Sequence, residues 1–417
     1  MEIEGGNMAT KKIAIISPGI LPVPSVLGGA VETLTSYIIE GYSKENGVEI
    51  DVFSCPSEKL DDIELSNINI IQLSISLSSR IKGKISRILQ SRFKIGRGYT
   101  AYQYELKKRI SLSKYNILLF ENCMKNVCIL KKLNPSQIWL YHMHNDIESK
   151  YNDKSIDNLK IVEKKCNYIL ACSNYIKNRC KKYISSEKLI TFYNAVDTDR
   201  FCHNKSKTVR KTLRDKYGIN ENAYVFLFTG RIVEEKGIDL LIDAFAEVKD
   251  DNTYLLIVGS LDSIFPLENA YIKEVINKPE VTKADSHIIF TGNINYDEIV
   301  DYYNTSDCVV FPSQINESFG MTIVEAMATK KPVIMTRTGG SPEIVDETCS
   351  IIINMGYQYT SELVDAMNML RDNPEKSHRM GINGYEIINK RIEFQKIHYF
   401  EIYNNIVNNI AKEIGDQ

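Results

Sequence analysis

Two glutamates within one short segment are spaced so that they can bind separate parts of one ligand. Glu317 and Glu325 are separated by seven residues, and Gly320 lies between them. Glu317 falls in an expected loop, where its carboxylate can accept hydrogen bonds from sugar hydroxyls. Glu325 falls in the helix that follows, roughly two turns further on at ~1.5 Å per residue, where it suits a ribose diol. Two solvated glutamates beside an ordinary strand–helix unit are the alternative.

Two cations and a helix N-terminus would suit the phosphate of such a ligand. Arg231 and Lys236 lie in a loop bounded by Gly230 and Gly237. An arginine binds a diphosphate bidentately, and a lysine acts as a point charge. The loop around Gly320 leads into a helix, whose free N–H groups attract phosphate. Ordinary surface charges are the alternative interpretation of the two cations.

A glycine pair near the N-terminus forms another candidate phosphate-binding loop. Gly28 and Gly29 follow a strand pattern at 12–17 and precede a helical pattern at 31–42. A strand, a glycine-containing loop and a helix open a Rossmann-like unit. The spacing G-x-G-x-x-G is missing, so the sequence does not support NAD binding. A plain turn remains the alternative for these glycines.

Two histidines lie at the end of the strand pattern at 138–142. In α/β sheets, ligands bind beyond the carboxyl ends of the strands. We expect His142 to lie inside the strand in a structural role, and His144 to be the better site candidate. A loop histidine that caps a neighbouring element is the alternative.

Strand patterns and helical patterns alternate in both halves of the chain, which predicts an α/β fold of two Rossmann-like domains. In the first half, buried strand patterns lie at 12–17, 49–54, 68–73, 115–121, 138–142, 167–173 and 189–193. In the second half they lie at 224–229, 253–259, 287–291, 308–311 and 332–335.

The segment 312–343 closely resembles the donor-site signature of the retaining GT-B glycosyltransferases of family 4, the glycosyl transferases group 1. The match is carried by Glu317-Ser318-Phe319-Gly320, Glu325-Ala326, Gly339-Gly340, Pro342-Glu343 and Gly230-Arg231 with Glu235-Lys236-Gly237. The resemblance covers nearly the whole chain. Ala195 departs from the pattern, because family members commonly have glycine there.

This resemblance implies a GT-B fold, in which two Rossmann-like domains face an interdomain cleft. It implies an acceptor-binding domain at 1–197, to which a C-terminal helix at about 396–417 returns, and a donor-binding domain at 198–395.

The resemblance also implies roles for the candidate residues. Glu317 would bind the donor sugar and Glu325 the ribose, and the catalytic set would be Glu317, His144, Arg231 and Lys236. Ser318 and the backbone of Phe319, Gly320 and Met321 would contact sugar and phosphate, the backbone at Asn293 and Ile294 the nucleobase, and Gly28 and Gly29 the diphosphate.

The implied reaction is transfer of a sugar from a nucleotide diphosphate sugar, with a UDP-sugar favoured, with retained configuration. No Asp-x-Asp stands in a suitable strand context, so we expect no required metal and no cofactor besides the donor. A sugar-nucleotide epimerase of similar fold and a non-catalytic partner subunit are the alternatives. The presence of Arg231, Lys236, Glu317 and Glu325 favours a transferase.

The amino-acid composition limits the possible binding partners and the cellular location of the protein. The 417 residues carry 51 Lys and Arg against 53 Asp and Glu, so no overall field favours nucleic acid. No apolar run is long enough to span a membrane, and nine cysteines without a CxxC pair suggest reduced thiols. We therefore expect a cytoplasmic enzyme with a glycan or lipid-linked glycan acceptor in bacterial surface polysaccharide or glycoconjugate synthesis.

One basic stretch suggests a peripheral membrane contact. No acidic residue occurs between Ser66 and Tyr104, and Arg80 to Arg97 interleaves seven basic residues with apolar ones at helical spacing. A basic amphipathic helix can lie on an anionic membrane surface, here the inner face of the cell membrane. A helix packed on its own domain is the alternative.

Overall fold

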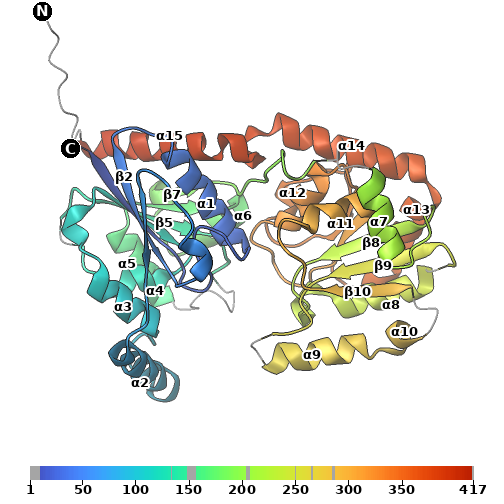
Figure 1. Ribbon diagram of the computed structural model, residues 1–417, viewed down its shortest axis with the longest axis horizontal. Helices are drawn as coiled ribbons and strands as arrows, with labels where there is room; N and C mark the ends of the chain where they lie inside the picture. The colour runs from blue at the N-terminus through green and yellow to red at the C-terminus, as the bar shows by residue number, and fades with distance from the viewer. Residues whose placement is uncertain are drawn as a thin grey trace, which may run out of the picture. The chain divides into compact units, whose positions relative to one another are not determined.

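A computed structural model describes residues 10–132, 134–147, 156–202, 207–248, 250–263, 266–283 and 287–415. Figure 1 shows its helices and strands. The chain divides into unit 1, Met1–Asn194 with His398–Gln417, and unit 2, Ala195–Ile397. The outer ends of the domains expected from the sequence, 1–9 and 416–417, lie outside the described residues. The acceptor and donor roles given to these domains stay predictions.

Unit 1 is built on a seven-stranded parallel sheet in the order β3-β2-β1-β4-β5-β6-β7. Its strands are β1 (Lys11–Ile16), β2 (Val48–Ser54), β3 (Ile68–Gln72), β4 (Ile117–Glu121), β5 (Ile138–Met143), β6 (Tyr168–Ala171) and β7 (Leu189–Thr191). Every residue of β4 and β5 is buried, as expected for parallel strands covered on both faces. The order of the strands reverses between β1 and β4, and α/β folds bind ligands at such a switch point.

The helices of unit 1 cover this sheet. They are α1 (Ala30–Tyr42), α2 (Leu77–Phe93), α3 (Ala101–Arg109), α4 (Met124–Ile129), α5 (Ile156–Lys165), α6 (Asn174–Cys180) and α15 (Lys396–Gly415), with 3₁₀ turns η1 (Glu58–Leu60), η2 (Leu112–Lys114) and η3 (Ser186–Lys188).

The last helix, α15, returns to unit 1, which confirms the prediction for the C-terminal segment. The ring of Tyr399 stacks on Phe192 at 4.5 Å, and the ring of Phe400 meets Tyr42 edge-on at 4.8 Å. A side chain at Gly41 would lie within 1.9 Å of the Phe400 ring, so a glycine is needed for α1 and α15 to approach this closely.

Unit 2 repeats the α/β plan with a six-stranded parallel sheet in the order β10-β9-β8-β11-β12-β13. Its strands are β8 (Tyr224–Thr229), β9 (Thr253–Val258), β10 (Ile288–Gly292), β11 (Cys308–Phe311), β12 (Val333–Thr336) and β13 (Ser350–Ile353). Its helices are α7 (Lys207–Lys216), α8 (Ile238–Val248), α9 (Pro266–Ile276), α10 (Pro279–Thr282), α11 (Ile299–Thr305), α12 (Met321–Ala328), α13 (Tyr359–Asp372) and α14 (Pro374–Lys390), with η4 (Glu234–Lys236), η5 (Ser341–Glu343) and η6 (Ile392–Phe394).

The core of unit 2 lies between its sheet and the helices α8 and α13. Phe226 and Ile257 from the sheet pack with Phe245 of α8 and Met367 of α13, and all four side chains are buried. The two parallel sheets confirm the α/β class, and their carboxyl edges carry the candidate site residues.

The basic stretch predicted from the sequence forms α2, at the periphery of unit 1 next to α3 (Figure 1). Ser79 and Gly83 are its buried residues. The apolar side chains of Leu77, Ile85 and Phe93 are 74%, 52% and 61% exposed. The helix nevertheless packs on α3 of its own unit through Gly83, so the membrane contact and the helix packed on its own domain both stay predictions.

Candidate functional site

Glu317 and Lys236 meet at the carboxyl edge of the unit 2 sheet. Glu317 lies in the loop between β11 and α12, and Lys236 ends η4 in the loop after β8. Since β8 and β11 are neighbours in the sheet, the two loops emerge side by side. The Lys236 ammonium lies 2.5 Å from Oε1 of Glu317, and the hydroxyl of Ser313 donates to the same oxygen at 2.5 Å. Both charged groups are mostly buried, so their pairing is little screened by solvent.

The loop that carries Glu317 is shaped by glycines on both sides. Gly320 has a φ of 122°, a conformation that favours glycine, and α12 begins at the next residue, Met321. A side chain at Gly339 would lie 2.0 Å from the carbonyl oxygen of Glu317, and the N–H of Gly340 donates to that oxygen at 2.7 Å. The Gly-Gly pair of the signature thus fixes the backbone that presents the carboxylate.

The other predicted members of this loop lie around the N-terminus of α12. Ser318 is half-buried, and Phe319 is buried with its ring 5.6 Å from that of Phe394. The first N–H groups of α12 lie beside Gly320 and have no partner within the helix, which makes this end attractive to a phosphate.

Glu325 lies within α12, and its carboxylate is held by a tyrosine that sequence reasoning missed. The hydroxyl of Tyr303 in α11 donates to Oε2 of Glu325 at 2.7 Å and lies 2.9 Å from the hydroxyl of Thr229. Burial raises the pKa of Glu325, while the bond from Tyr303 acts in the opposite direction. No pattern in the sequence linked Tyr303 to Glu325, which is 22 residues away.

Arg231 lies in the same loop as Lys236 but is more accessible. Its side chain is half-exposed, and its guanidinium lies 3.7 Å from the carboxylate of Glu268 in α9. A side chain at Gly259 would lie 2.2 Å from the carbonyl oxygen of Gly230, so the ends of β8 and β9 need glycine to pass this closely. Arg231 and Lys236, the two predicted phosphate-binding cations, thus both lie in the loop between β8 and α8.

Asn293 and Ile294 follow β10 at the same carboxyl edge, three strands away from β11. Asn293 is exposed and Ile294 is half-buried. Close to them in sequence, the ring of Tyr296 carries the Arg200 guanidinium at 3.7 Å from its centroid. The predicted residues of unit 2 thus follow one sheet edge, as an extended ligand requires.

In unit 1 the glycine pair adopts backbone conformations that favour glycine. Gly28 and Gly29 have φ values of 80° and 100°, and α1 begins at the next residue. The carboxylate of Glu32 folds back over Gly29, where a side chain would meet Oε2 at 2.3 Å. Burial raises the pKa of Glu32 to about 7. Sequence reasoning missed Glu32, although its place in the first turn of a helix after two glycines was a usable signal.

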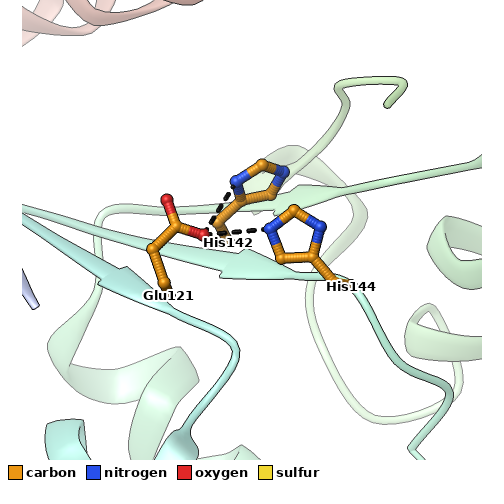
Figure 2. Close-up of side chains that lie close together, drawn as sticks. All are labelled: Glu121, His142 and His144. Carbon is orange, nitrogen blue, oxygen red and sulfur yellow. Dashed lines mark hydrogen bonds and ion pairs between the residues drawn. The ribbon is translucent and has the colours of Figure 1, made fainter. Parts of the chain in front are cut away.

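His144 lies in a buried cluster with His142 and Glu121, shown in Figure 2. Nε2 of His144 lies 2.9 Å from Oε2 of Glu121, and Nδ1 of His142 lies 3.2 Å from the same oxygen. Burial lowers the pKa of His142. Burial would raise the pKa of Glu121, but the two histidines hold it below its usual range. His142 lies inside β5, as expected, whereas Glu121 was missed.

A large cavity of unit 2 lies at the opposite edge of its sheet and is not the candidate site. It measures about 960 Å³ and is lined by Tyr224 and Thr253, the first residues of β8 and β9. Its cations Arg210 and Lys331 already bind backbone carbonyls, including that of Ser306. The parallel strands therefore place this cavity at the amino edge, away from Glu317.

Comparison with known proteins identifies the family. Residues 209–387 match the model of the glycosyl transferases group 1. Over these residues the chain is similar to the group 1 glycosyltransferases.

The similarity to this family extends over most of the chain. The chain is 26% identical to spore coat protein SA of Bacillus subtilis over 378 residues, which are 89% of this chain and 92% of that protein. It is 28% identical to the lipopolysaccharide 1,2-N-acetylglucosaminetransferase of Salmonella typhimurium over 251 residues, 59% of this chain and 61% of that enzyme.

Solved structures confirm the GT-B fold. Anabaena HepE in complex with UDP and glucose matches with a TM-score of 0.73 at 19% identity, covering 96% of this chain and 99% of its own. Sucrose-phosphate synthase of Thermosynechococcus elongatus matches with a TM-score of 0.76 at 18% identity, covering 97% of this chain and 100% of its own. Among the described residues, no helix is long and apolar enough to cross a membrane.

Proposed function

We propose that this group 1 glycosyltransferase transfers a sugar from a nucleotide diphosphate sugar, with a UDP-sugar favoured, and retains the anomeric configuration. The observation that carries the proposal is the pairing of Lys236 with Glu317 beside the N-terminus of α12. One cation for phosphate and one carboxylate for sugar hydroxyls are already adjacent there. The UDP and UDP-glucose complexes of HepE support this choice of donor.

In the proposed reaction, the oxygen of an acceptor hydroxyl bonds to the anomeric carbon on the face that the diphosphate leaves. The bond from that carbon to the β-phosphate oxygen breaks, the electron pair stays on the phosphate, and a phosphate oxygen takes the hydroxyl proton. Arg231, Lys236 and the free amides around Gly320 stabilise the charge that develops on the diphosphate.

The two glutamates would bind different parts of the donor. Glu317 gives up its pairing with Lys236 to sugar hydroxyls, while Lys236 turns to phosphate. Glu325 accepts hydrogen bonds from the ribose, for which it must be ionised although burial opposes ionisation. The bond from Tyr303 favours the ionised carboxylate and fixes one of its oxygens, so the other is left for the ribose.

We propose that unit 1 binds the acceptor. Gly28 and Gly29 offer backbone that a diphosphate can approach, because neither carries a side chain. Nε2 of His144 is engaged by Glu121, and we propose that this histidine acts near the reacting sugar.

We further propose that the acceptor is a glycan, or a lipid-linked glycan, of the bacterial surface, met at the cytoplasmic face of the membrane. The similarity to a spore coat protein and to a lipopolysaccharide N-acetylglucosaminetransferase supports this class of acceptor. The exposed apolar and basic residues of α2 support a peripheral membrane contact.

Donor binding tests the proposal without knowledge of the acceptor. Because a ligand of the native state raises its stability by mass action, UDP and UDP-sugars should raise the melting temperature more than ADP or GDP. Lys236→Ala should weaken this effect, and the exposed Lys273→Ala should preserve it. A protein that responds to no nucleotide diphosphate would contradict the donor assignment.

Two further measurements separate transfer from the alternatives. Incubation of UDP-sugar without acceptor should give little turnover, whereas an epimerase releases nucleotide and free sugar under the same conditions. Since the cations on the diphosphate are supplied by side chains, added Mg²⁺ should not be required for transfer. A strict Mg²⁺ requirement would overturn the metal-independent mechanism.

A further inference from the structure

Three potential ligand atoms converge between two neighbouring strands of unit 1. Glu121 ends β4 and lies directly opposite His142 of β5 in the parallel register. His144 lies two residues further on and therefore faces the same side of the sheet as His142. The carboxylate oxygen and the two ring nitrogens all lie within 4.8 Å of one another. Figure 2 shows the three side chains pointing toward one another.

The cluster is buried and leaves polar atoms without hydrogen bonds. Glu121 and His142 are 0% exposed and His144 is 5% exposed. Within the part of the chain that the structure describes, Oε1 of Glu121, both ring nitrogens of His142 and Nδ1 of His144 make no hydrogen bond. Each buried unsatisfied group costs about 1–3 kcal/mol, and hydrogen bonds among the described residues do not satisfy these atoms.

The position of His142 fits coordination better than a hydrogen bond. Its Nδ1 lies 3.2 Å from Oε2 of Glu121, an ion-pair distance, yet the two atoms are not aligned as a hydrogen bond. A hydrogen bond requires the N–H to point along the line between the two atoms. A cation instead requires the ligand atoms to lie about 2.0–2.2 Å from a shared point, which atoms this close to one another allow.

We propose that Glu121, His142 and His144 bind one divalent transition-metal cation of the zinc type through Oε2, Nδ1 and Nε2. Two imidazoles and one carboxylate are a donor set for zinc, whereas Mg²⁺ and Ca²⁺ prefer oxygen ligands alone. The cation joins the carboxyl ends of β4 and β5 and leaves Nδ1 of His144 unligated. It is separate from the donor diphosphate, whose cations are Arg231 and Lys236.

Metal content tests this site directly, whether or not the proposed function holds. The protein is prepared without an affinity tag, incubated with an equimolar amount of zinc, desalted and analysed by mass spectrometry for metal content. We expect close to one zinc per chain. X-ray absorption at the zinc edge should show nitrogen and oxygen ligands at about 2.0–2.2 Å.

Cysteine thiols are the main competitor for zinc, because the chain has nine cysteines. Sulfur ligands at about 2.3 Å would assign the bound zinc to cysteines and overturn the proposal. A zinc content below about a tenth of an equivalent would overturn it as well and leave a hydrogen-bonded cluster.

Substitutions identify the ligands. Glu121→Gln and His142→Gln should each lower zinc affinity by at least 10-fold, and the exposed His378→Gln in α14 should not change it. Unchanged zinc binding in both cluster variants would contradict the assignment. If a variant does not fold, as judged by circular dichroism, the absorption spectrum of the wild-type protein still decides the question.

Discussion

At the scale of single residues, the site is assembled from side chains that already pair with one another. Lys236 and Glu317 neutralise each other in the absence of a donor, and Ser313 holds the same carboxylate oxygen. A donor that binds both side chains replaces this ion pair with two charge-assisted contacts. Because both charged groups are already mostly buried, donor binding adds little to the cost of desolvating them.

Removal of either phosphate-binding cation should lower turnover. Because each cation stabilises charge that develops on the leaving diphosphate, Arg231→Ala and Lys236→Ala should each reduce kcat by about 10²-fold or more. Steady-state kinetics with a UDP-sugar measure this effect, and the exposed Lys273→Ala is the control. Near wild-type rates in both variants would refute the diphosphate role.

The two glutamates should separate binding from turnover. Glu325→Ala should raise the Kd of the nucleotide, because the ribose loses its acceptor, whereas Glu317→Ala should mainly lower kcat. Tyr303→Phe removes the hydrogen bond to Glu325 and should shift the Kd in the same direction by a smaller factor. Calorimetric titration with UDP gives the Kd, and normal binding by Glu325→Ala would disprove the ribose assignment.

At the scale of elements, α2 is held by its first turn rather than by its apolar face. The carboxylate of Glu105 in α3 accepts hydrogen bonds from the hydroxyls of Ser76 and Ser79 at 2.8 Å each. Gly83 adds a close approach, since a side chain there would lie 2.5 Å from the backbone nitrogen of Ala101. The apolar side of the helix is thereby left exposed.

The anchor of α2 should depend on pH. Hydrogen bonds from Ser76 and Ser79, with Arg109, lower the pKa of Glu105 to about 2 from its usual 4.5. A lowered folded-state pKa contributes stability above pH 4.5, and this contribution is lost as the pH falls towards 2. The difference in unfolding free energy between wild type and Glu105→Gln should therefore shrink with acidification. A difference that is constant from pH 7 to pH 3 would argue against this linkage.

The exposed surface of α2 should bind anionic vesicles. The five basic side chains of α2 and that of Lys94, just after the helix, are exposed, whereas Arg97 hydrogen-bonds Asn158. Each exposed cation near an anionic surface contributes roughly 1 kcal/mol, and the apolar side chains add burial. Sedimentation with phosphatidylserine-containing liposomes should capture the protein at low salt and release it at high salt.

Charge reversal distinguishes this surface from general attraction. Glutamates in place of Arg80, Lys84 and Arg87 should abolish sedimentation. The matched reversal, which should leave sedimentation unchanged, is at the exposed Lys273, Lys376 and Lys390. If the protein stays in the supernatant at low salt, or if both triple variants behave alike, the membrane contact is refuted and a water-borne acceptor is favoured.

At the scale of the whole molecule, the chain leaves unit 1 at Asn194 and re-enters it at His398. Unit 1 therefore depends on the C-terminal helix for part of its core. Tyr399 and Tyr403 are fully buried, and Phe400 packs on Tyr42 across Gly41.

Loss of this packing should destabilise unit 1. Phe400 is half-buried, so Phe400→Ala should cost about 2 kcal/mol, less than the 3–5 kcal/mol of a fully buried phenylalanine. Hydrogen exchange should show the loss of protection in the unit 1 strands and not in β8 to β12. An equal loss in both units would contradict a local role for α15.

The sequence by itself determined the α/β class and most of the strands, and it supplied the residues of the proposed donor motif. Glycines, cations and carboxylates in a short segment can predict a phosphate- and sugar-binding loop, because their chemistry depends on only a few neighbouring residues. Short apolar runs predict buried parallel strands, because this pattern too lies within a few neighbouring residues. The short β13 and the helix α3 were not recognised, because neither carries a long or clearly periodic apolar pattern.

Only the tertiary structure decided which residues meet across the sheet. The register of β4 on β5 places Glu121 against His142, and the packing of α11 on the sheet brings Tyr303 to Glu325. The sequence also left undecided whether the apolar side of α2 is exposed, because a helical pattern identifies an apolar face but not what covers it. Such contacts join segments that are distant in sequence, and they are set by strand pairing and close packing rather than by local residue pattern.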